Sequence, residues 1–161
     1  MQIYLAGPLF TQAERDWNLR LAEPIRAAGH SVFLPQTEVQ AIATLDARAI
    51  FRVDVDGVRG ADAVIAVVDG ADPDSGTSFE VGMAFALGIP IVLVRTDFRA
   101  GGDALPGQQL ATVNLMLSQA ASRVVALTDP GATLDDLAAG VIAALANLPI
   151  ELPGVERHRR A

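Results

Sequence analysis

Five short apolar runs are spaced along the chain, each bounded by glycine, proline or polar positions. They cover residues 2–6, 31–34, 63–68, 89–94 and 123–127. The third and fourth runs are continuous and rich in β-branched side chains, a pattern typical of parallel strands buried on both faces. The pattern therefore predicts five strands, with these two inside a sheet.

The segments between the runs carry apolar residues at helical spacing. A capping box at Thr11 and Glu14 starts the first predicted helix, which extends to Gly29 and contains Pro24, a residue expected to kink or divide it. The remaining predicted helices cover residues 45–59, 77–87 and 133–148, with a shorter helical segment containing Leu110, Asn114 and Leu117.

Strands and helices alternate without an interdomain linker, which favours a parallel sheet covered by helices on both faces. We predict one α/β domain over residues 1–148, flavodoxin-like and doubly wound around a five-stranded parallel sheet. Residues 149–161 are interpreted as a tail, proline-rich and then basic. Ligands of such sheets bind beyond the carboxyl ends of the strands. This rule selects the loops at residues 7–10 and 69–75 and the segment from Thr96 onwards.

Composition narrows the possible partners and location. The 161 residues are 51% apolar and carry a net charge of −7, so we expect no binding to polymeric nucleic acid, which requires a basic surface. Cysteine is absent, which excludes disulfides and thiolate chemistry. No apolar run is long enough to span a membrane, and the first residues do not resemble a secretion signal. We therefore expect a cytoplasmic protein without a membrane partner.

The candidate chemistry rests on carboxylates, because the glycine-rich nucleotide loops and the nucleophilic-serine elbow are missing. Asp54 falls within the apolar stripe of the helix predicted over 45–59, where an unpaired buried charge would cost several kcal/mol. Either the helix end frays and Asp54 is solvated or caps another group, or this carboxylate has a function. The aspartate-rich loop at 69–76 is more typical of a turn than of a metal site, and no metal is expected.

Glu80 also has two interpretations. Thr77 and Glu80 have the spacing of a capping box, in which the glutamate would bond back to the Thr77 amide. Glu80 also heads a helix face that carries Met83, Ala84 and Leu87, directly beyond a central strand. There it would point into the crevice, and the helix N-terminus would favour its ionised form by about 0.3 to 1 kcal/mol. Spacing alone does not decide between a cap and a catalytic group.

Four segments, taken in order, resemble the nucleoside 2-deoxyribosyltransferase family. They are the opening Ile3-Tyr4-Leu5-Ala6-Gly7-Pro8-Leu9-Phe10, the element Asp54-x-x-Gly57 with Asp62 beyond it, the segment Asp74-x-Gly76-x-x-x-Glu80-x-Gly82-x-Ala84, and Asn114-Leu115-Met116. The resemblance extends from residue 3 to about residue 120. The family's C-terminal segment, which in some members completes the site, is not recognisable in residues 151–161.

The resemblance implies a flavodoxin-like fold and an enzyme that transfers 2-deoxyribose from a deoxynucleoside to a free nucleobase without a cofactor. Glu80 would be the nucleophile, held by Tyr4, with Asp54 or Asp74 assisting proton transfer to the departing base. Further substrate contacts are expected from Gly7, Phe10, Asp74, Gly76 and Met116. Asn114 would reach the sugar 5′-hydroxyl of a neighbouring subunit, which implies a homo-oligomer.

Two other functions stay open. One is an N-glycosidase for 2′-deoxynucleoside 5′-monophosphates, in which water replaces the acceptor base; Ser75, Ser78 and the helix amides could supply some phosphate donors. The other is a non-catalytic module that binds nucleosides or nucleotides, since one fold hosts many functions.

Overall fold

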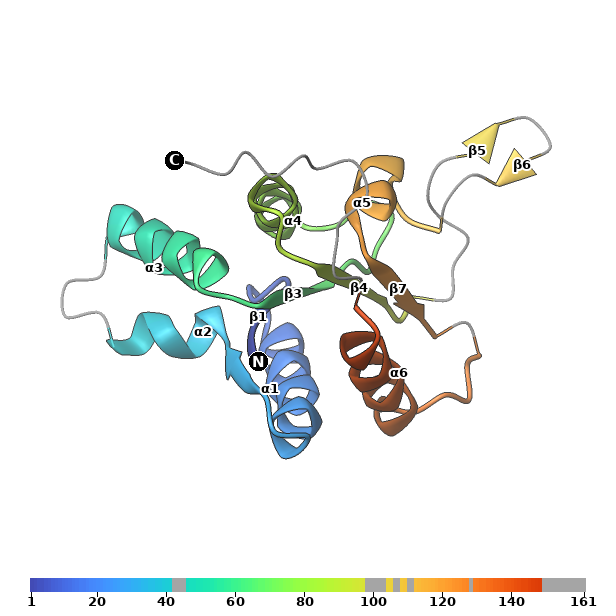
Figure 1. The fold of residues 1–161 in the computed structure, drawn as a ribbon, viewed down its shortest axis with the longest axis horizontal. Helices are drawn as coiled ribbons and strands as arrows, with labels where there is room; N and C mark the ends of the chain where they lie inside the picture. Colours follow the sequence, from blue (N-terminus) through green and yellow to red (C-terminus); the bar gives the residue numbers. More distant parts are fainter. Residues whose placement is uncertain (42–45, 98–103, 106–107, 110–111, 128, 149–161) are drawn as a thin grey trace.

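The computed structural model describes residues 1–41, 46–97, 104–105, 108–109, 112–127 and 129–148 (Figure 1). Its centre is a five-stranded parallel sheet in the order β2-β1-β3-β4-β7, which confirms the predicted doubly wound α/β fold. The strands are β1 (Gln2–Ala6), β2 (Ser31–Phe33), β3 (Ala63–Val67), β4 (Ile91–Arg95) and β7 (Arg123–Ala126). Every residue of β3 and β4 is buried, as their continuous apolar runs predicted.

Helices cover both faces of this sheet (Figure 1). One apolar core joins the sheet to α1 (Gln12–Ala27) and α6 (Leu134–Ala146). A second core, on the opposite face, joins it to α3 (Ala47–Arg59), α4 (Ser75–Leu87) and α5 (Leu115–Ala120). Alternate residues of β1 feed the two cores: Ile3 and Leu5 enter the first, and Tyr4 and Ala6 the second. The second face contains the candidate site.

The strand order reverses at β1. The chain goes from β1 to its neighbour β2 on one side and then crosses to β3 on the other side. The connections that leave β1 and β3 therefore diverge, and they open a crevice at the carboxyl edge of the sheet.

Several local features differ from the sequence-based expectation. Pro35 does not only end a strand: it begins α2 (Pro35–Glu38), followed by the 3₁₀ turn η1 (Val39–Ala41), because proline suits the first position of a helix. Pro24 does not divide α1, which stays one helix. A small antiparallel pair, β5 (Ala104–Leu105) and β6 (Gln108–Gln109), was not predicted. Leu45, Leu110 and the tail at 149–161 lie outside the described residues.

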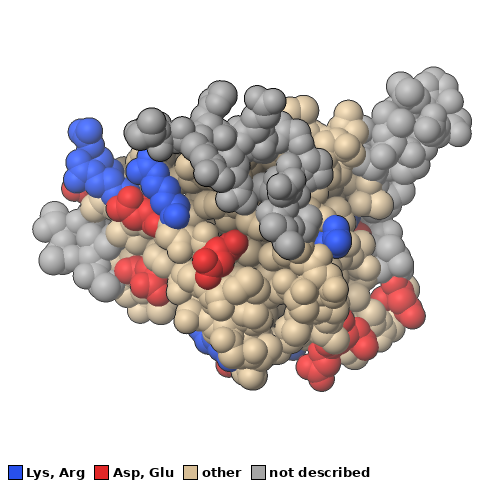
Figure 2. All heavy atoms as spheres, in the orientation of Figure 1, with Lys and Arg blue, Asp and Glu red and all other residues tan. Residues whose placement is uncertain are grey.

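On the face drawn in Figure 2, the basic side chains form small separate groups, not a continuous track. None of the helices in the described part of the chain is long and apolar enough to cross a membrane.

Candidate active site

A tyrosine from the sheet and a glutamate from a helix meet at the centre of the site. Tyr4 lies in the middle of β1 with no exposed surface, and its hydroxyl donates a hydrogen bond of 2.6 Å to Oε1 of Glu80 on α4. The tyrosine ring stacks on Phe33 of β2 at a centroid distance of 5.2 Å. The ring is therefore fixed from one side, and its hydroxyl fixes the glutamate.

Gly57 allows α3 to approach these two rings. A Cβ atom at this position would lie 2.7 Å from the Phe33 ring and 2.9 Å from the Tyr4 ring, distances that side chains essentially never adopt. Glycine therefore lets the helix backbone pack directly on the rings. The same helix carries Asp54, one turn earlier, and brings it to the site.

The structure excludes one of the two interpretations of Glu80, the capping box. Helix α4 begins at Ser75, two residues earlier than predicted, and its N-cap is Asp74, whose carboxylate accepts hydrogen bonds from the amide and hydroxyl of Thr77. Because the Thr77 amide already has a partner and Glu80 lies in the second turn, no capping box forms between them. Glu80 is bonded to Tyr4 instead. The predicted inward face is also shorter than expected, since Leu87 at its end is exposed.

Asp54 lies inside α3 and not at a frayed helix end, and its side chain is partly buried. Its Oδ1 atom is buried and has no hydrogen-bond partner among the described residues. A buried acceptor without a donor is costly, and such atoms in native proteins usually receive a proton, a water or a ligand.

These carboxylates border one cavity of about 310 Å³. It lies beyond the carboxyl ends of β1 and β2 and is closed by α3 and the start of α4. Its lining combines apolar side chains with a few convergent polar groups, the usual composition of a small-molecule site. The lining residues are Gly7, Leu9, Phe10, Pro35, Gln36, Val39, Ile50, Asp54, Asp74, Gly76, Thr77 and Glu80.

Most of the residues singled out from the sequence meet at this cavity. The predicted residues that line it are Glu80, Asp54, Asp74, Gly7, Phe10 and Gly76. Tyr4 does not line it but holds Glu80 by the hydrogen bond from its hydroxyl. The loops at 7–10 and 69–75 both contribute, as the carboxyl-edge rule predicted. Thr96 does not: it lines a separate cavity of about 350 Å³ together with Trp17 and Asp69.

Asn114 and Met116 are not brought to this cavity within the chain. Asn114 is the N-cap of α5, where its Oδ1 accepts a hydrogen bond of 2.9 Å from the Met116 amide. The Met116 side chain is 78% exposed. Neither residue lines the cavity that contains Glu80.

The sequence-based interpretation missed one wall of the cavity, formed by Pro35, Gln36 and Val39 of the α2 and η1 segment. Gln36 is held in place, because its Nε2 donates to the carbonyl of Arg15 and its Oε1 accepts from Asn18. Proline at the first position of a helix was the signal that could have revealed this wall.

The acidic groups of the site have altered proton affinities. Burial, followed by the nearby charges of Asp54 and Asp74, raises the pKa of Glu80 to about 7, although the Tyr4 hydrogen bond lowers it. Burial also raises the pKa of Asp54. Burial and the Glu80 charge raise the pKa of Tyr4, which keeps its proton and acts as donor.

The expectation that the helix N-terminus would favour an ionised Glu80 was therefore wrong in its net effect. Glu80 lies beyond the first turn of α4, where the effect of the helix dipole has already declined. Desolvation and the two neighbouring carboxylates dominate. Near neutral pH Glu80 is thus partly ionised and partly protonated.

Comparisons with solved structures show which proteins this fold resembles. A conserved protein from Enterococcus faecalis V583 is 31% identical with a TM-score of 0.69, and the match covers 89% of this chain and 98% of that one. A 2-deoxyribosyltransferase from Bacillus psychrosaccharolyticus is 21% identical with a TM-score of 0.64, covering 86% and 90%. A CMP N-glycosidase from Clostridium botulinum is 17% identical with a TM-score of 0.58, covering 88% and 99%.

The comparison with curated proteins gave no match. The family model described as nucleoside 2-deoxyribosyltransferase matches residues 3–116, a span that contains the Tyr4 and Glu80 pair and every residue lining the cavity of about 310 Å³. From this match and the fold we conclude that the chain belongs to the nucleoside 2-deoxyribosyltransferase family.

Proposed function

We propose that this protein is a nucleoside 2-deoxyribosyltransferase that moves 2-deoxyribose between nucleobases through a covalent intermediate on Glu80. The observation that carries the proposal is the Glu80 carboxylate at a small cavity, held by Tyr4 at 2.6 Å. A carboxylate fixed in this way is suited to covalent capture of a sugar carbon during cleavage of a glycosidic bond.

In the first step, an oxygen of Glu80 bonds to the anomeric carbon while the bond from that carbon to the base nitrogen breaks. The electron pair of the broken bond goes to the departing base, and a proton from a carboxylic acid neutralises it. Asp54 is suited to supply this proton, because burial raises its pKa and one of its oxygens has no partner among the described residues.

In the second step, a nitrogen of the incoming base bonds to the anomeric carbon, and the electron pair of the ester bond returns to Glu80. The incoming base then loses a proton to the ionised Asp54. Two displacements retain the configuration of the sugar. The absent 2-hydroxyl makes the oxocarbenium-like state easier to reach, so one nucleophile with modest acid assistance is sufficient.

A hydrolase acting on 2′-deoxynucleoside 5′-monophosphates is the nearest alternative. The start of α4 would be the natural phosphate site, but Asp74 accepts from the Thr77 amide and hydroxyl, and Ser78 donates to the Asp74 carbonyl. Among the described residues that line the cavity, three are carboxylates and none is a cation. Because these charges oppose a phosphate, the arrangement supports a substrate with a free 5′-hydroxyl.

Asn114 is proposed to complete the site of a neighbouring subunit in a homo-oligomer. Its position outside the cavity of its own chain, next to the exposed Met116, supports this role. The proposed partners are therefore a deoxynucleoside, a free nucleobase and a second copy of the chain.

Incubation of the protein with thymidine and adenine tests the proposal. We expect deoxyadenosine, with no product from E80A although this variant stays folded. Release of thymine and deoxyribose 5′-phosphate from thymidine 5′-monophosphate, without deoxyadenosine from thymidine and adenine, would favour the hydrolase. A protein that binds thymidine without releasing thymine would favour a non-catalytic module.

A further inference from the structure

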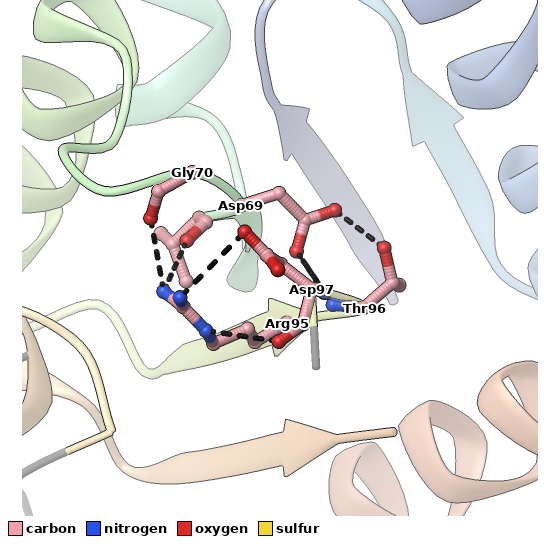
Figure 3. A network of polar contacts seen from close by, with 6 residues as sticks. Asp69, Gly70, Arg95, Thr96 and Asp97 are labelled. Carbon is pink, nitrogen blue, oxygen red and sulfur yellow. Dashed lines mark hydrogen bonds and ion pairs between the residues drawn. The ribbon is translucent and has the colours of Figure 1, made fainter. Parts of the chain in front are cut away.

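The loop between β3 and α4 leads directly into the residues of the candidate site. It turns at Gly70, whose φ of 98° favours glycine, and ends at Asp74, the N-cap of the helix that carries Glu80. The position of this loop therefore sets the position of the nucleophile. Polar contacts with the end of β4 hold the loop (Figure 3).

Arg95 provides the first set of these contacts. It is the last residue of β4, and only 4% of it is exposed. Its Nη1 donates to the carbonyl oxygens of Val68 and Gly70, both at 3.3 Å. Its Nη2 lies 3.9 Å from a carboxylate oxygen of Asp97. A buried guanidinium is costly unless its donors are satisfied, and here two of its acceptors belong to the loop.

Asp69 provides the second set, and here too the loop is the acceptor. Its carboxylate accepts hydrogen bonds from the amide and hydroxyl of Thr96 and from the amide of Asp97 at 3.0 Å. In all of these bonds the first part of the loop, Val68 to Gly70, accepts, from Arg95 and from the two residues that follow it. Such charge-assisted bonds are among the strong ones in proteins.

We propose that Arg95 is a positioning residue for the reaction, which fixes the β3–α4 loop so that Asp74 and Glu80 keep their places at the cavity. Arg95 itself does not line that cavity, so it acts through the loop and not on substrate. This inference rests on the proposed function only for its kinetic consequence, because the restraint of the loop can be measured without any substrate.

Amide hydrogen exchange on the full chain tests the restraint. R95M removes the donors, and we expect faster exchange in peptides that cover residues 69–80. The control is L137A, a truncation in the core on the opposite face that lowers stability without touching the loop. Equal exchange of these peptides in both variants would overturn the proposal. If R95M does not fold, R95K serves instead, since lysine keeps the charge but not the fork of donors.

Kinetics separate positioning from stability. We expect R95M to lower kcat/KM for base exchange about 10- to 100-fold, with R95K between R95M and wild type and L137A unchanged at a temperature where all are folded. Displacement of Asp74 also weakens its effect on the Glu80 pKa, so the acidic limb of the pH profile should move to lower pH in R95M. A wild-type kcat/KM and pH profile in a destabilised R95M would contradict the proposal.

The results that would exclude the proposed enzymatic function differ from those that would exclude the role of Arg95. A wild-type protein without base exchange or glycosidic cleavage would exclude the enzyme, while the exchange rates of residues 69–80 in R95M would still decide whether Arg95 holds the loop.

Discussion

The hydroxyl of Tyr4 and the carboxylate of Glu80, 76 residues apart in sequence, are joined by a hydrogen bond of 2.6 Å. The bond links the middle of a buried strand to the second turn of α4. Burial raises the pKa of Tyr4 above its ordinary value, far above the pKa of about 7 of Glu80, so the shared hydrogen lies on the tyrosine and the negative charge on the glutamate. This hydrogen bond orients the Glu80 carboxylate and keeps a fraction of the Glu80 side chains ionised near neutral pH.

Replacement of Tyr4 by phenylalanine should impair the reaction most strongly at low pH. The Tyr4 hydrogen bond lowers the pKa of Glu80, so Y4F should raise that pKa above about 7 and shift the acidic limb of kcat/KM to higher pH. A hydrogen bond to a charged group contributes about 1.5 to 3 kcal/mol, so about a tenfold or larger loss is expected. The measurement is the pH dependence of base exchange; an unshifted limb would contradict this role.

Glu80 should reduce the stability of the folded protein at high pH. Its folded pKa of about 7 exceeds its ordinary value of 4.5, so the folded state binds the proton more tightly than the unfolded chain does. The free energy of unfolding contributed by this group is therefore highest at low pH and falls as pH rises from about 4.5 to about 7.

E80Q carries no charge and keeps an acceptor for Tyr4. At about pH 8 its Tm should be higher than that of wild type, and its free energy of unfolding should be larger by at most about 3 kcal/mol. Both differences should become smaller as the pH is lowered towards 5. Thermal unfolding of both proteins across this range tests the prediction. A constant difference at all pH values would show that the charge is not responsible.

Two glycines form a matched pair. A Cβ at Gly57 would lie within 3 Å of the Tyr4 and Phe33 rings, so G57A should destabilise the fold by about 1 to 3 kcal/mol and reduce activity by displacing α3 and Asp54. A Cβ at Gly82 of α4 meets nothing within 4 Å, so G82A should stabilise the helix by up to about 1 kcal/mol and keep the activity. Denaturant unfolding and base exchange measure both effects, and equal stability of the two variants would contradict this packing.

The sequence predicted the sheet well, because the runs at residues 63–68 and 89–94 have one local pattern that a buried parallel strand requires. It predicted the bounds of α4 less well. Both Asp74 and Thr77 are good N-cap residues, and only the contacts of the folded chain select Asp74.

The contacts within the site were harder to predict from local sequence patterns. Nothing near Tyr4 or Glu80 indicates that they meet, since their contact depends on the order of strands β1 and β3; their pairing was predicted only from the family resemblance. The cavity wall that contains Gln36 was missed because the four residues of α2 are too few to show helical periodicity. The pKa of Glu80 was predicted in the wrong direction, because burial and the proximity of Asp54 are tertiary properties.

Mixing two inactive variants tests the proposed contribution of Asn114 to a neighbouring site. N114D keeps an oxygen acceptor for the Met116 amide, so α5 stays capped, but it loses the amide donor. After subunit exchange, N114D mixed with E80A should regain activity, because about a quarter of the sites then combine an intact Glu80 with an intact Asn114. No recovery from subunits that exchange would contradict a shared site.

The most direct test of the central claim is intact-protein and peptide mass spectrometry after brief incubation with a deoxynucleoside in the absence of an acceptor base. We predict a deoxyribosyl adduct on the peptide that contains Glu80, which disappears when adenine is added and deoxyadenosine forms, and which E80Q never shows. Base exchange at the wild-type rate in E80Q, or an adduct on another residue, would contradict Glu80 as the nucleophile.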